Sequence, residues 1–178
     1  YILNHYPNMP LQVCDLGTGT GAIAISLKHE RPLWDIVAID IQPDAMALAQ
    51  KNAQRHHTPI SFICSNWFEH IPKSKFHIIV SNPPYIDPED PHLQQGDVQH
   101  EPKSALISDK HGLADIEYLL QNSAKHLHKN GMLIFEHGYD QQERILKMMQ
   151  AYGWQNARGF QDEEGQPRFC VGFCHAEY

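Results

Sequence analysis

The sequence predicts a single α/β domain built on a mostly parallel sheet of seven strands, and three observations support this fold class. Short apolar runs alternate with segments whose apolar residues recur at helical spacing, which is the pattern of βαβ units. A glycine-rich turn, Gly17–Gly21, follows the first apolar run and opens the first helical segment. The last two apolar runs are separated by a polar turn at 162–165, which predicts an antiparallel hairpin at one edge of the sheet.

The first half of the chain should form four strands and two helices. Its apolar runs predict strands at 11–16, 35–39, 60–64 and 76–81, and the segments between them predict helices at 22–29 and 43–56. Pro43 fits the first turn of the second helix, because the N–H that proline lacks would have no intrahelical partner there. The face that packs on the sheet should then carry Ala45, Leu48, Ala49 and Ala53.

The second half should add three strands and two helices after a long irregular segment at 86–111. Loops of that length within a compact domain are usually functional or disordered. A helix is predicted at 115–129, ended by Asn130-Gly131, with one apolar stripe made of Ile116, Leu119, Leu120 and Leu127. The remaining elements are expected to be a strand at 132–136, a helix at 141–152, and strands at 154–160 and 169–173.

Composition limits the classes of protein to which the chain can belong. Its 178 residues suit one domain, and the sequence has neither an apolar run long enough to span a membrane nor the pattern of a signal peptide. The formal net charge of −7 argues against a broad phosphate-binding surface, so no direct nucleic-acid partner is expected. We therefore expect a cytoplasmic protein, monomeric and without a membrane partner.

The four cysteines and thirteen histidines indicate neither a disulfide framework nor a metal centre. Cys14 and Cys64 lie inside apolar strands, and Cys170 and Cys174 share one face of the last strand, so reduced core thiols are expected. The histidines are not spaced as metal ligands, and we expect them to lie on the surface. No metal is expected.

Four polar or glycine-rich segments lie at the ends of predicted strands, namely Gly17–Gly21, Asp40, 64–68 and Asn82–Tyr85. The carboxyl ends of parallel strands meet at one edge of a sheet, and ligands bind there near the point where the strand order reverses. A glycine turn lets the backbone approach a ligand without a Cβ in the way. Asp40 follows the turn at the spacing at which a carboxylate accepts hydrogen bonds from both hydroxyls of a ribose.

The turn favours S-adenosylmethionine (SAM) as the cofactor. Its pattern is G-x-G-x-G and not the G-x-G-x-x-G of dinucleotide sites, and SAM has no pyrophosphate to place on a helix N-terminus. Trp67, just past the third strand, is expected to lie against the adenine face, although core packing of its indole is the alternative. Asn66 is expected to bond the adenine edge through its amide. The candidate contacts in the turn are Gly17, Thr18, Gly19, Thr20 and Gly21.

The tetrapeptide Asn82-Pro83-Pro84-Tyr85 ends the fourth predicted strand and is the candidate catalytic and substrate-binding site. Two prolines donate no backbone hydrogen bond and fix their own φ angles, so they hold a rigid corner. The Asn82 side-chain oxygen and the Pro83 carbonyl can each accept one N–H of a planar –NH2 group. They would thereby orient its nitrogen toward the sulfonium methyl and stabilise the positive charge that develops there. Tyr85 can stack on the flat group, and Asn82 can also touch the cofactor.

On these residues the chain resembles the protein-(glutamine-N5) methyltransferases of the release-factor type, the PrmC/HemK family. The resemblance runs over almost the whole chain and rests on the stretches 15–21, 65–68, 81–86, 90–98 and 101–106. It implies a Rossmann-like class I SAM-dependent methyltransferase fold. It also implies transfer of a methyl group to the glutamine of the Gly-Gly-Gln motif in class I peptide chain release factors, with S-adenosylhomocysteine (SAH) as product. The implied SAM contacts are Gly17–Gly21, Asp40, Trp67 and Asn82, and the implied substrate contacts are Asn82–Tyr85.

The chain departs from the family pattern at two positions. Asn66 stands where Asp is common, and His100 stands where Phe is usual before Glu101-Pro102. The family also has an N-terminal helical domain that helps to recognise the release factor, and this chain does not contain it. Residues 1–178 are therefore expected to form the methyltransferase catalytic domain alone.

The residues leave four other activities open. A related enzyme could methylate a glutamine of a ribosomal protein. A methyltransferase acting on the exocyclic amine of adenine in nucleic acid would share the Asn82–Tyr85 corner, but the negative charge counts against it. A Rossmann oxidoreductase would need the G-x-G-x-x-G turn that is absent here, and a non-catalytic SAM-binding module would not need the corner.

Overall fold

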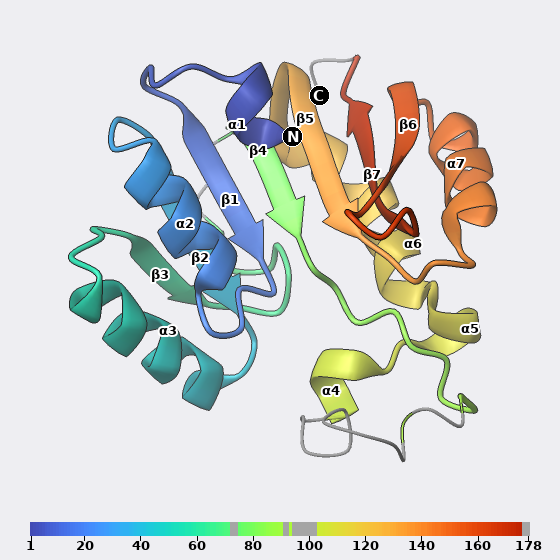
Figure 1. Ribbon diagram of the computed structural model, residues 1–178, viewed down its shortest axis with the longest axis horizontal. Coiled ribbons are helices and arrows are strands. Elements are labelled where there is room, and N and C mark those ends of the chain that lie inside the picture. Colours follow the sequence, from blue (N-terminus) through green and yellow to red (C-terminus); the bar gives the residue numbers. More distant parts are fainter. Residues whose placement is uncertain (72–74, 91–92, 94–102, 176–178) are drawn as a thin grey trace.

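The computed structural model describes residues 1–71, 75–90, 93 and 103–175. These residues form one seven-stranded sheet in the order β3-β2-β1-β4-β5-β7-β6, with helices on both faces (Figure 1). Strands β1 to β5 pair in parallel, whereas β7 runs antiparallel to both β5 and β6. The predicted mostly parallel sheet with a C-terminal antiparallel hairpin is therefore confirmed.

The strands lie close to their predicted positions, because each apolar run is bounded by polar or glycine residues. They are β1 (Gln12–Leu16), β2 (Asp35–Asp40), β3 (Ser61–Cys64), β4 (Phe76–Ser81), β5 (Leu127–Glu136), β6 (Gln155–Gln161) and β7 (Pro167–Phe173). The helices are α1 (Ile2–His5), α2 (Ala22–Glu30), α3 (Pro43–Arg55), α4 (Lys103–Leu106), α5 (Asp109–Gly112), α6 (Ala114–Asn122), the 3-10 helix η3 (Ser123–His126) and α7 (Gln142–Ala151). Within the described residues, no helix is both long and apolar enough to cross a membrane.

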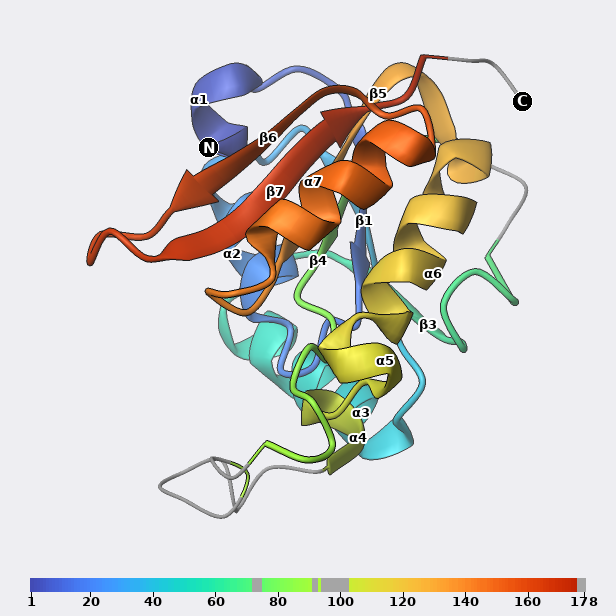
Figure 2. The same cartoon turned by 90° about the vertical axis from the view of Figure 1, so that its right-hand side faces the viewer.

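Each face of the sheet has its own apolar core. Successive residues of a strand point to opposite faces, so Val13 belongs to the core cluster that contains Leu27 of α2, while its neighbour Cys14 belongs to the cluster that contains Ile116 of α6. Helices α2 and α3 cover one face, and α6 and α7 cover the other (Figures 1 and 2). The layers leave the carboxyl ends of β1, β2 and β4 on one rim of the domain.

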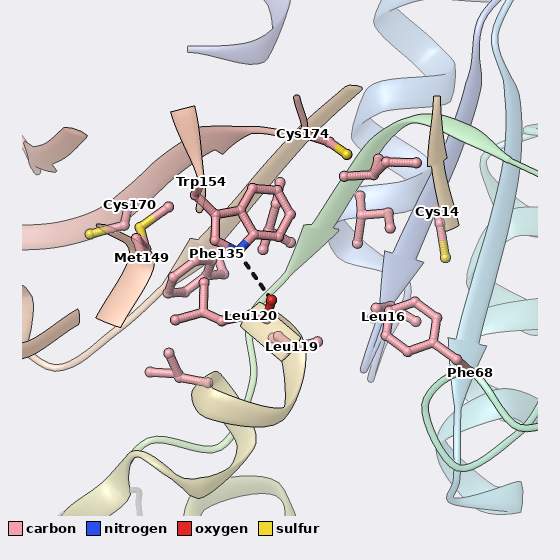
Figure 3. Close-up of a cluster of buried hydrophobic side chains, with 14 of the residues drawn as sticks. Cys14, Leu16, Phe68, Leu119, Leu120, Phe135, Met149, Trp154, Cys170 and Cys174 are labelled. Carbon is pink, nitrogen blue, oxygen red and sulfur yellow. Dashed lines mark hydrogen bonds between the residues drawn. The ribbon is translucent and has the colours of Figure 1, made fainter. Parts of the chain in front are cut away.

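The core under α6 and α7 is the larger one, and it contains a buried hydrogen bond between a tryptophan side chain and the backbone of α6. The Trp154 indole, next to β6, donates from Nε1 to the Leu120 carbonyl of α6 at 3.0 Å (Figure 3). A buried indole N–H without a partner would be costly, so this bond lets the ring pack against Met149 and Phe135. The start of the antiparallel hairpin is thereby tied to helix α6.

The predicted helix at 115–129 was too long. Helix α6 ends at Asn122, η3 follows, and Leu127 begins β5 by pairing with Phe76 of β4. Leu127 is fully buried at the spacing of the helical stripe, but it reaches the core from a strand. Asn130, with φ of 61°, and Gly131 therefore lie within β5, where the register to β4 shifts, and do not end a helix.

Four smaller expectations were also wrong. Leu48 is 45% exposed, and Met46 takes its place on the buried face of α3. Cys64 is exposed at the end of β3, whereas the other three cysteines are buried. His137 is buried, and the ring of His126 stacks on Phe68, so not all histidines lie on the surface. The segment at 86–111 is not wholly irregular, because it contains α4 and α5.

Candidate functional site

The sheet order reverses between β1 and β4, and the predicted site lies at this point. From β1 the chain proceeds outward to β2 and β3, and it then returns to place β4 on the other side of β1. Ligands of open α/β sheets bind in the crevice at such a switch point. The ends of the two strands are joined by the Ser81 hydroxyl, which donates to the Leu16 carbonyl at 2.8 Å. The glycine turn after β1 and the corner after β4 are therefore neighbours.

The glycine turn has glycine at the three positions where the backbone is left-handed. Gly17, Gly19 and Gly21 all have left-handed φ angles, of 69°, 55° and 83°. A Cβ on Gly21 would meet the Cβ of Ala49 at 3.1 Å, whereas a Cβ on Gly19 would meet nothing within 4 Å. Gly21 is thus needed for packing of α2 against α3. Gly19 faces open space, so its backbone is accessible to a ligand.

Asp40 joins this turn to the beginning of α3. Its Oδ2 accepts the Gly19 N–H at 2.9 Å, and its Oδ1 accepts the Gln42 N–H at 2.9 Å. Each carboxylate oxygen retains a lone pair after these bonds. The carboxylate is half-buried, and both oxygens are oriented by the backbone, which fits a group that holds the two hydroxyls of a ribose.

A second carboxylate, Asp15, lies beneath the turn and was not singled out from the sequence. It is fully buried, and its Oδ2 accepts the Thr18 hydroxyl at 2.6 Å and the Ala24 N–H at 3.1 Å. Within the described structure its Oδ1 has no hydrogen-bond partner. Burial raises the pKa of Asp15 to about 6, against the opposing effect of the Thr18 and Ala24 bonds. Thr18 is therefore a support of the turn, because its hydroxyl is already used.

The predicted adenine contacts lie just past β3 on the same rim. Trp67 is half-buried, has a left-handed φ of 47°, and places its ring 6.0 Å from that of Tyr118. It therefore packs partly on the core while retaining an exposed surface. Asn66 is exposed, and its amide nitrogen donates to Glu69 Oε1 at 2.8 Å, so a contact with an adenine edge through that nitrogen would compete with this bond.

The corner after β4 presents a free amide. Asn82 is exposed, Pro83 is buried, and Pro84 is half-buried. Among the described residues, the Asn82 side chain has no hydrogen-bond partner, so both of its polar atoms are available. A Cβ on Gly17 would lie 3.9 Å from the Asn82 carbonyl, which shows how closely the glycine turn and the corner approach each other.

Beside the corner lies an open hollow of about 320 Å³. Its lining is mostly aliphatic and aromatic, and includes Ile2, Ile23, Leu27, Ile134 and Phe169. Its polar lining includes Asn82 from the corner and Glu136 from the end of β5. An uncharged group could therefore be held against the Asn82 amide here.

Tyr85 is held at its hydroxyl by the neighbouring strand. Its phenol donates to Glu136 Oε1 at 3.0 Å, from the end of β5. Burial, followed by the charge of Glu136, raises the pKa of Tyr85 to about 12, and Arg168 opposes the shift. Tyr85 is therefore a neutral phenol at physiological pH, and it is a poor candidate for a general base.

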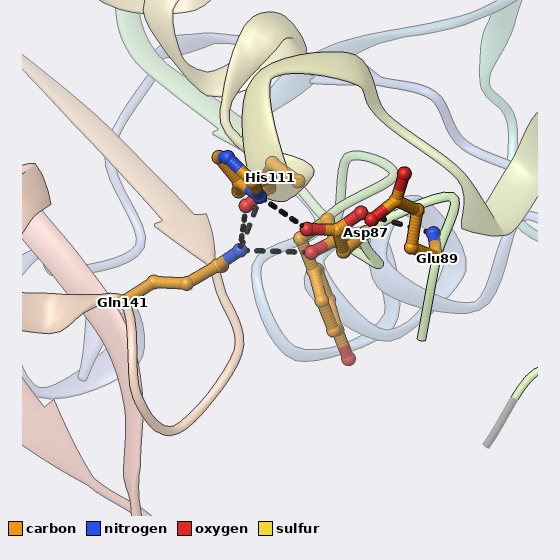
Figure 4. A network of polar contacts seen from close by, with 6 residues as sticks. Asp87, Glu89, His111 and Gln141 are labelled. Atoms are coloured by element: carbon orange, nitrogen blue, oxygen red, sulfur yellow. Dashed lines mark hydrogen bonds and ion pairs between the residues drawn. The ribbon is translucent and has the colours of Figure 1, made fainter. Parts of the chain in front are cut away.

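The backbone of Tyr85 is held by a residue from the turn before α7. The Gln141 amide donates from Nε2 to the Tyr85 carbonyl at 2.8 Å, with longer contacts to the carbonyls of His111 at 3.3 Å and Gly112 at 3.4 Å (Figure 4). His111 in turn pairs with Asp87 at 2.6 Å. The Glu89 backbone N–H and then His111 lower the pKa of the Asp87 carboxyl.

Sequence reasoning missed Asp15, Glu136 and Gln141 as members of this site. Asp15 directly precedes the glycine turn and could have been noticed as a charge inside an apolar strand. Glu136 and Gln141 are single polar residues, and no motif in the neighbouring sequence indicates that they belong to a site. Of the stretches that carry the family resemblance, 91–92 and 94–102, including His100, lie outside the described residues. Within the part that is described, no group of three His, Cys, Asp or Glu side chains could hold a metal ion.

Comparison with known proteins identifies relatives of this site and fold. The family described as "Methyltransferase small domain" matches residues 2–99. The release factor glutamine methyltransferase of Escherichia coli (strain K12) is 43% identical over 171 residues, which cover 96% of this chain and 62% of that protein. The protein of the same name from Vibrio cholerae is 44% identical over 165 residues, which cover 90% of this chain and 57% of that protein. The chain thus spans about three fifths of the length of these curated relatives.

Solved structures show the same fold at low sequence identity. A methyltransferase from Pyrococcus furiosus superposes with a TM-score of 0.74 at 15% identity, covering 98% of this chain and 80% of that one. A ribosomal protein L11 methylase from Lactobacillus delbrueckii subsp. bulgaricus gives 0.67 at 20% identity, covering 98% and 74%. These likenesses confirm the predicted Rossmann-like methyltransferase fold. Because the family match covers more than half of its residues, the chain belongs to the methyltransferase small domain family.

Proposed function

We propose that this domain transfers a methyl group from SAM to the side-chain amide nitrogen of the glutamine in the Gly-Gly-Gln motif of class I peptide chain release factors. The observation that carries the proposal is the free Asn82 amide on a proline-fixed corner, directly beside an accessible glycine turn. The names of the relatives, which are 43% and 44% identical, favour this substrate over others that carry a planar –NH2 group.

The cofactor would lie across the rim from β2 to β4. SAM, when bound, supplies an electrophilic methyl group on a sulfonium, and SAH is the product. Asp40 would accept the ribose hydroxyls, because its two oxygens are already oriented by the N–H groups of Gly19 and Gln42. Trp67 would cover the adenine face, and the turn Gly17–Gly21 would follow the remainder of the cofactor. Asn66 would bond the adenine edge only after giving up Glu69.

The corner would act on the substrate nitrogen. An amide nitrogen is a poor nucleophile, since its lone pair is delocalised into the carbonyl. Asn82 Oδ1 and the Pro83 carbonyl would each accept one of its N–H groups, which aligns the nitrogen and stabilises positive charge as the new C–N bond forms. The methyl group would pass to this nitrogen from the sulfur of SAM, whose C–S bond would break as the C–N bond forms, and the nitrogen would then release one proton to water. Tyr85, kept as a neutral phenol, would stack on the flat amide.

The partners follow from the same proposal. The protein substrate is a release factor, so the enzyme would work in the cytoplasm, and no second copy is required because every proposed contact comes from one chain. Residues 1–178 would supply the catalytic domain. Methylation of a ribosomal-protein glutamine or of adenine would need the same grip on an –NH2 group, and the net charge of −7 disfavours the nucleic acid.

The test is substrate choice with methyl-labelled SAM. The protein is incubated separately with a class I release factor, ribosomal proteins and adenine-containing DNA, and each is analysed by mass spectrometry. We expect one added methyl group on the glutamine of the Gly-Gly-Gln motif and none on a release factor in which that glutamine is glutamate. Label found only in ribosomal protein or DNA would refute the proposed substrate.

A further inference from the structure

Gln141 lies under the corner and connects three separate backbone segments. Its side chain is buried, with 6% of the residue exposed. On one side its Oε1 accepts the Gly138 N–H at 2.9 Å, within the turn that leads into α7. On the other side its Nε2 reaches the Tyr85 carbonyl at 2.8 Å. One amide therefore ties the turn between β5 and α7 to the Asn82–Tyr85 corner.

The third segment that Gln141 contacts has an unusual backbone. Lys110, His111 and Gly112 have φ angles of 56°, 57° and 75°, so three consecutive residues are left-handed. For residues with a Cβ, this conformation costs on the order of 1–3 kcal/mol each, and such backbone persists only where its surroundings hold it. Nε2 of Gln141 lies 3.3 Å and 3.4 Å from the carbonyls of His111 and Gly112. Gln141 is thus part of what holds this left-handed turn.

The left-handed turn packs directly against the backbone of the corner. A Cβ on Gly112 would lie 2.0 Å from the Tyr85 carbonyl oxygen and 2.6 Å from Gln141 Nε2, so no larger residue fits there without movement. Ile86 is also paired with this region, since its N–H bonds the Leu106 carbonyl at 2.9 Å and its carbonyl accepts the Ser108 N–H at 3.0 Å. The backbone on the far side of Tyr85 is therefore fixed from several directions.

Fixing Tyr85 fixes Asn82, because two prolines stand between them and leave the chain little freedom. We propose that Gln141 is a positioning residue for methyl transfer, which holds the Tyr85 carbonyl so that Asn82 and Pro83 keep the substrate nitrogen in line with the methyl group. This inference rests on the proposed function, and it adds a residue that touches neither cofactor nor substrate.

A purely structural role would be limited to the turn before α7. In that case the bond from Gly138 N–H to Gln141 Oε1 would matter, and the bond to Tyr85 would not. The two roles predict different results, because a positioning residue affects the rate of transfer more than the binding of cofactor. The neighbour Gln142 offers a matched control. It stands beside Gln141 at the start of α7, but it packs against Gly159 of β6, and its buried Oε1 has no partner in the described structure.

The experiment compares Gln141→Met with Gln142→Met, which remove the same amide from adjacent positions. We expect Gln141→Met to lower kcat about 10- to 100-fold, the loss that accompanies a misplacement of about 1 Å, while SAH affinity and KM for SAM change less than about threefold. Gln142→Met should retain the wild-type kcat. Should Gln141→Met not fold, Gln141→Glu keeps the oxygen that accepts from Gly138 and removes the amide donors, and the same loss of kcat is expected.

Hydrogen exchange separates this inference from the proposed function, since it needs no substrate. The Ile86 and Ser108 amides, which are hydrogen-bonded beside the corner, should exchange faster in Gln141→Met than in Gln142→Met. If the wild type does not methylate a release factor, the proposed function fails, and exchange alone decides whether Gln141 holds the corner. Unchanged exchange, or a kcat of Gln141→Met equal to that of the active wild type, would overturn the inference.

Discussion

The two sides of the candidate crevice are held in different ways. On the proposed cofactor side, the glycine turn is fixed by the end of β2, since the Thr18 N–H bonds the Ile39 carbonyl and the Gly19 N–H bonds the Asp40 carboxylate, both at 2.9 Å. On the substrate side, Tyr85 is fixed by side chains more than fifty residues away in sequence, namely Glu136 and Gln141. The first side is thus held within one βαβ unit, from β1 to β2, whereas the second is held by residues at and just after the end of β5.

With the roles proposed above, this difference should separate effects on cofactor binding from effects on methyl transfer. A turn held within its own βαβ unit keeps its shape when a contact from the second half of the chain is lost, so cofactor binding should survive changes at the end of β5 and in the turn before α7. The corner has no such independence, because its supports come from β5 and from the turn before α7. We therefore expect variants of the two sides to differ in whether affinity or rate is lost.

The largest effect should come from Asn82→Ala. Asn82 Oδ1 would meet positive charge that exists only as the methyl group moves, so its loss should lower kcat by roughly 10²–10³, the usual cost of one preorganised polar partner. Asn82→Asp keeps an acceptor oxygen and should retain partial activity. Single-turnover kinetics at saturating SAM measures the step directly. A transfer rate near that of the wild type would show that the corner only shapes the site.

A large effect on stability is expected from Asp15, under the cofactor side. Its pKa is raised from 3.8 to about 6 by burial, so the folded state binds the proton more tightly than the unfolded state. The contribution of Asp15 is therefore fully favourable below about pH 4 and is lost as the pH rises to about 6, a change of about 3 kcal/mol.

Asp15→Asn removes this titration and keeps an oxygen for Thr18 and Ala24. The difference in free energy of unfolding, wild type minus variant, should therefore fall by roughly 2 to 3 kcal/mol between pH 4 and pH 7, whatever the constant cost of the new amide. Urea unfolding at several pH values measures it. The difference isolates Asp15 from Asp87 and Glu117, whose lowered pKa values act in the opposite sense. A difference that is independent of pH would contradict the assignment.

Asp40→Ala tests the cofactor side with a somewhat smaller effect. Two ribose hydroxyls would lose their charged acceptor, and the Gly19 N–H would lose its partner. SAH binding should weaken by about 1–3 kcal/mol, as measured by titration calorimetry. The Gln141 variant, on the other side, should bind SAH normally, and equal losses in both would remove the distinction between the two sides.

The sequence predicted the fold well because the signals were local. Apolar runs bounded by glycine or charge located six of the seven strands within two residues, while β5 begins five residues before its predicted start, and Pro43 marked the beginning of α3. The errors came from residues whose spacing fits two structures. Leu127 continues the helical stripe of α6 and also begins β5, and only its pairing with Phe76 decides between them. Helix α1, with four residues, gave no periodic signal.

The site was predictable only in part, because only some of its residues lie in short motifs that can be recognised from neighbouring residues. The glycine turn, Asp40 and the corner are compact motifs at strand ends, and the structure brings them to one rim. Their roles in binding and catalysis remain predictions. Gln141 was placed correctly at the beginning of a helix, but nothing near it in sequence indicates that its amide reaches Tyr85. Such a contact follows from the parallel pairing of β4 with β5, which brings the turn before α7 beside the corner, and no short stretch of sequence contains all three segments.

The smallest effect should come from Tyr85→Phe, which compares the two ends of one residue. The change removes the bond from the phenol to Glu136 and leaves the ring and the carbonyl held by Gln141 in place. The loss of one half-buried hydrogen bond should lower the free energy of unfolding by about 1 kcal/mol, measured against Tyr139→Phe at an exposed position.

Because the pKa of Tyr85 is raised to about 12, the phenol does not ionise in the assay range, and the pH–rate profiles of wild type and variant should be parallel. If stacking is the role of the ring, kcat should fall less than in Gln141→Met. A larger fall in Tyr85→Phe would place the critical support of the corner at the hydroxyl and Glu136 instead of at the backbone.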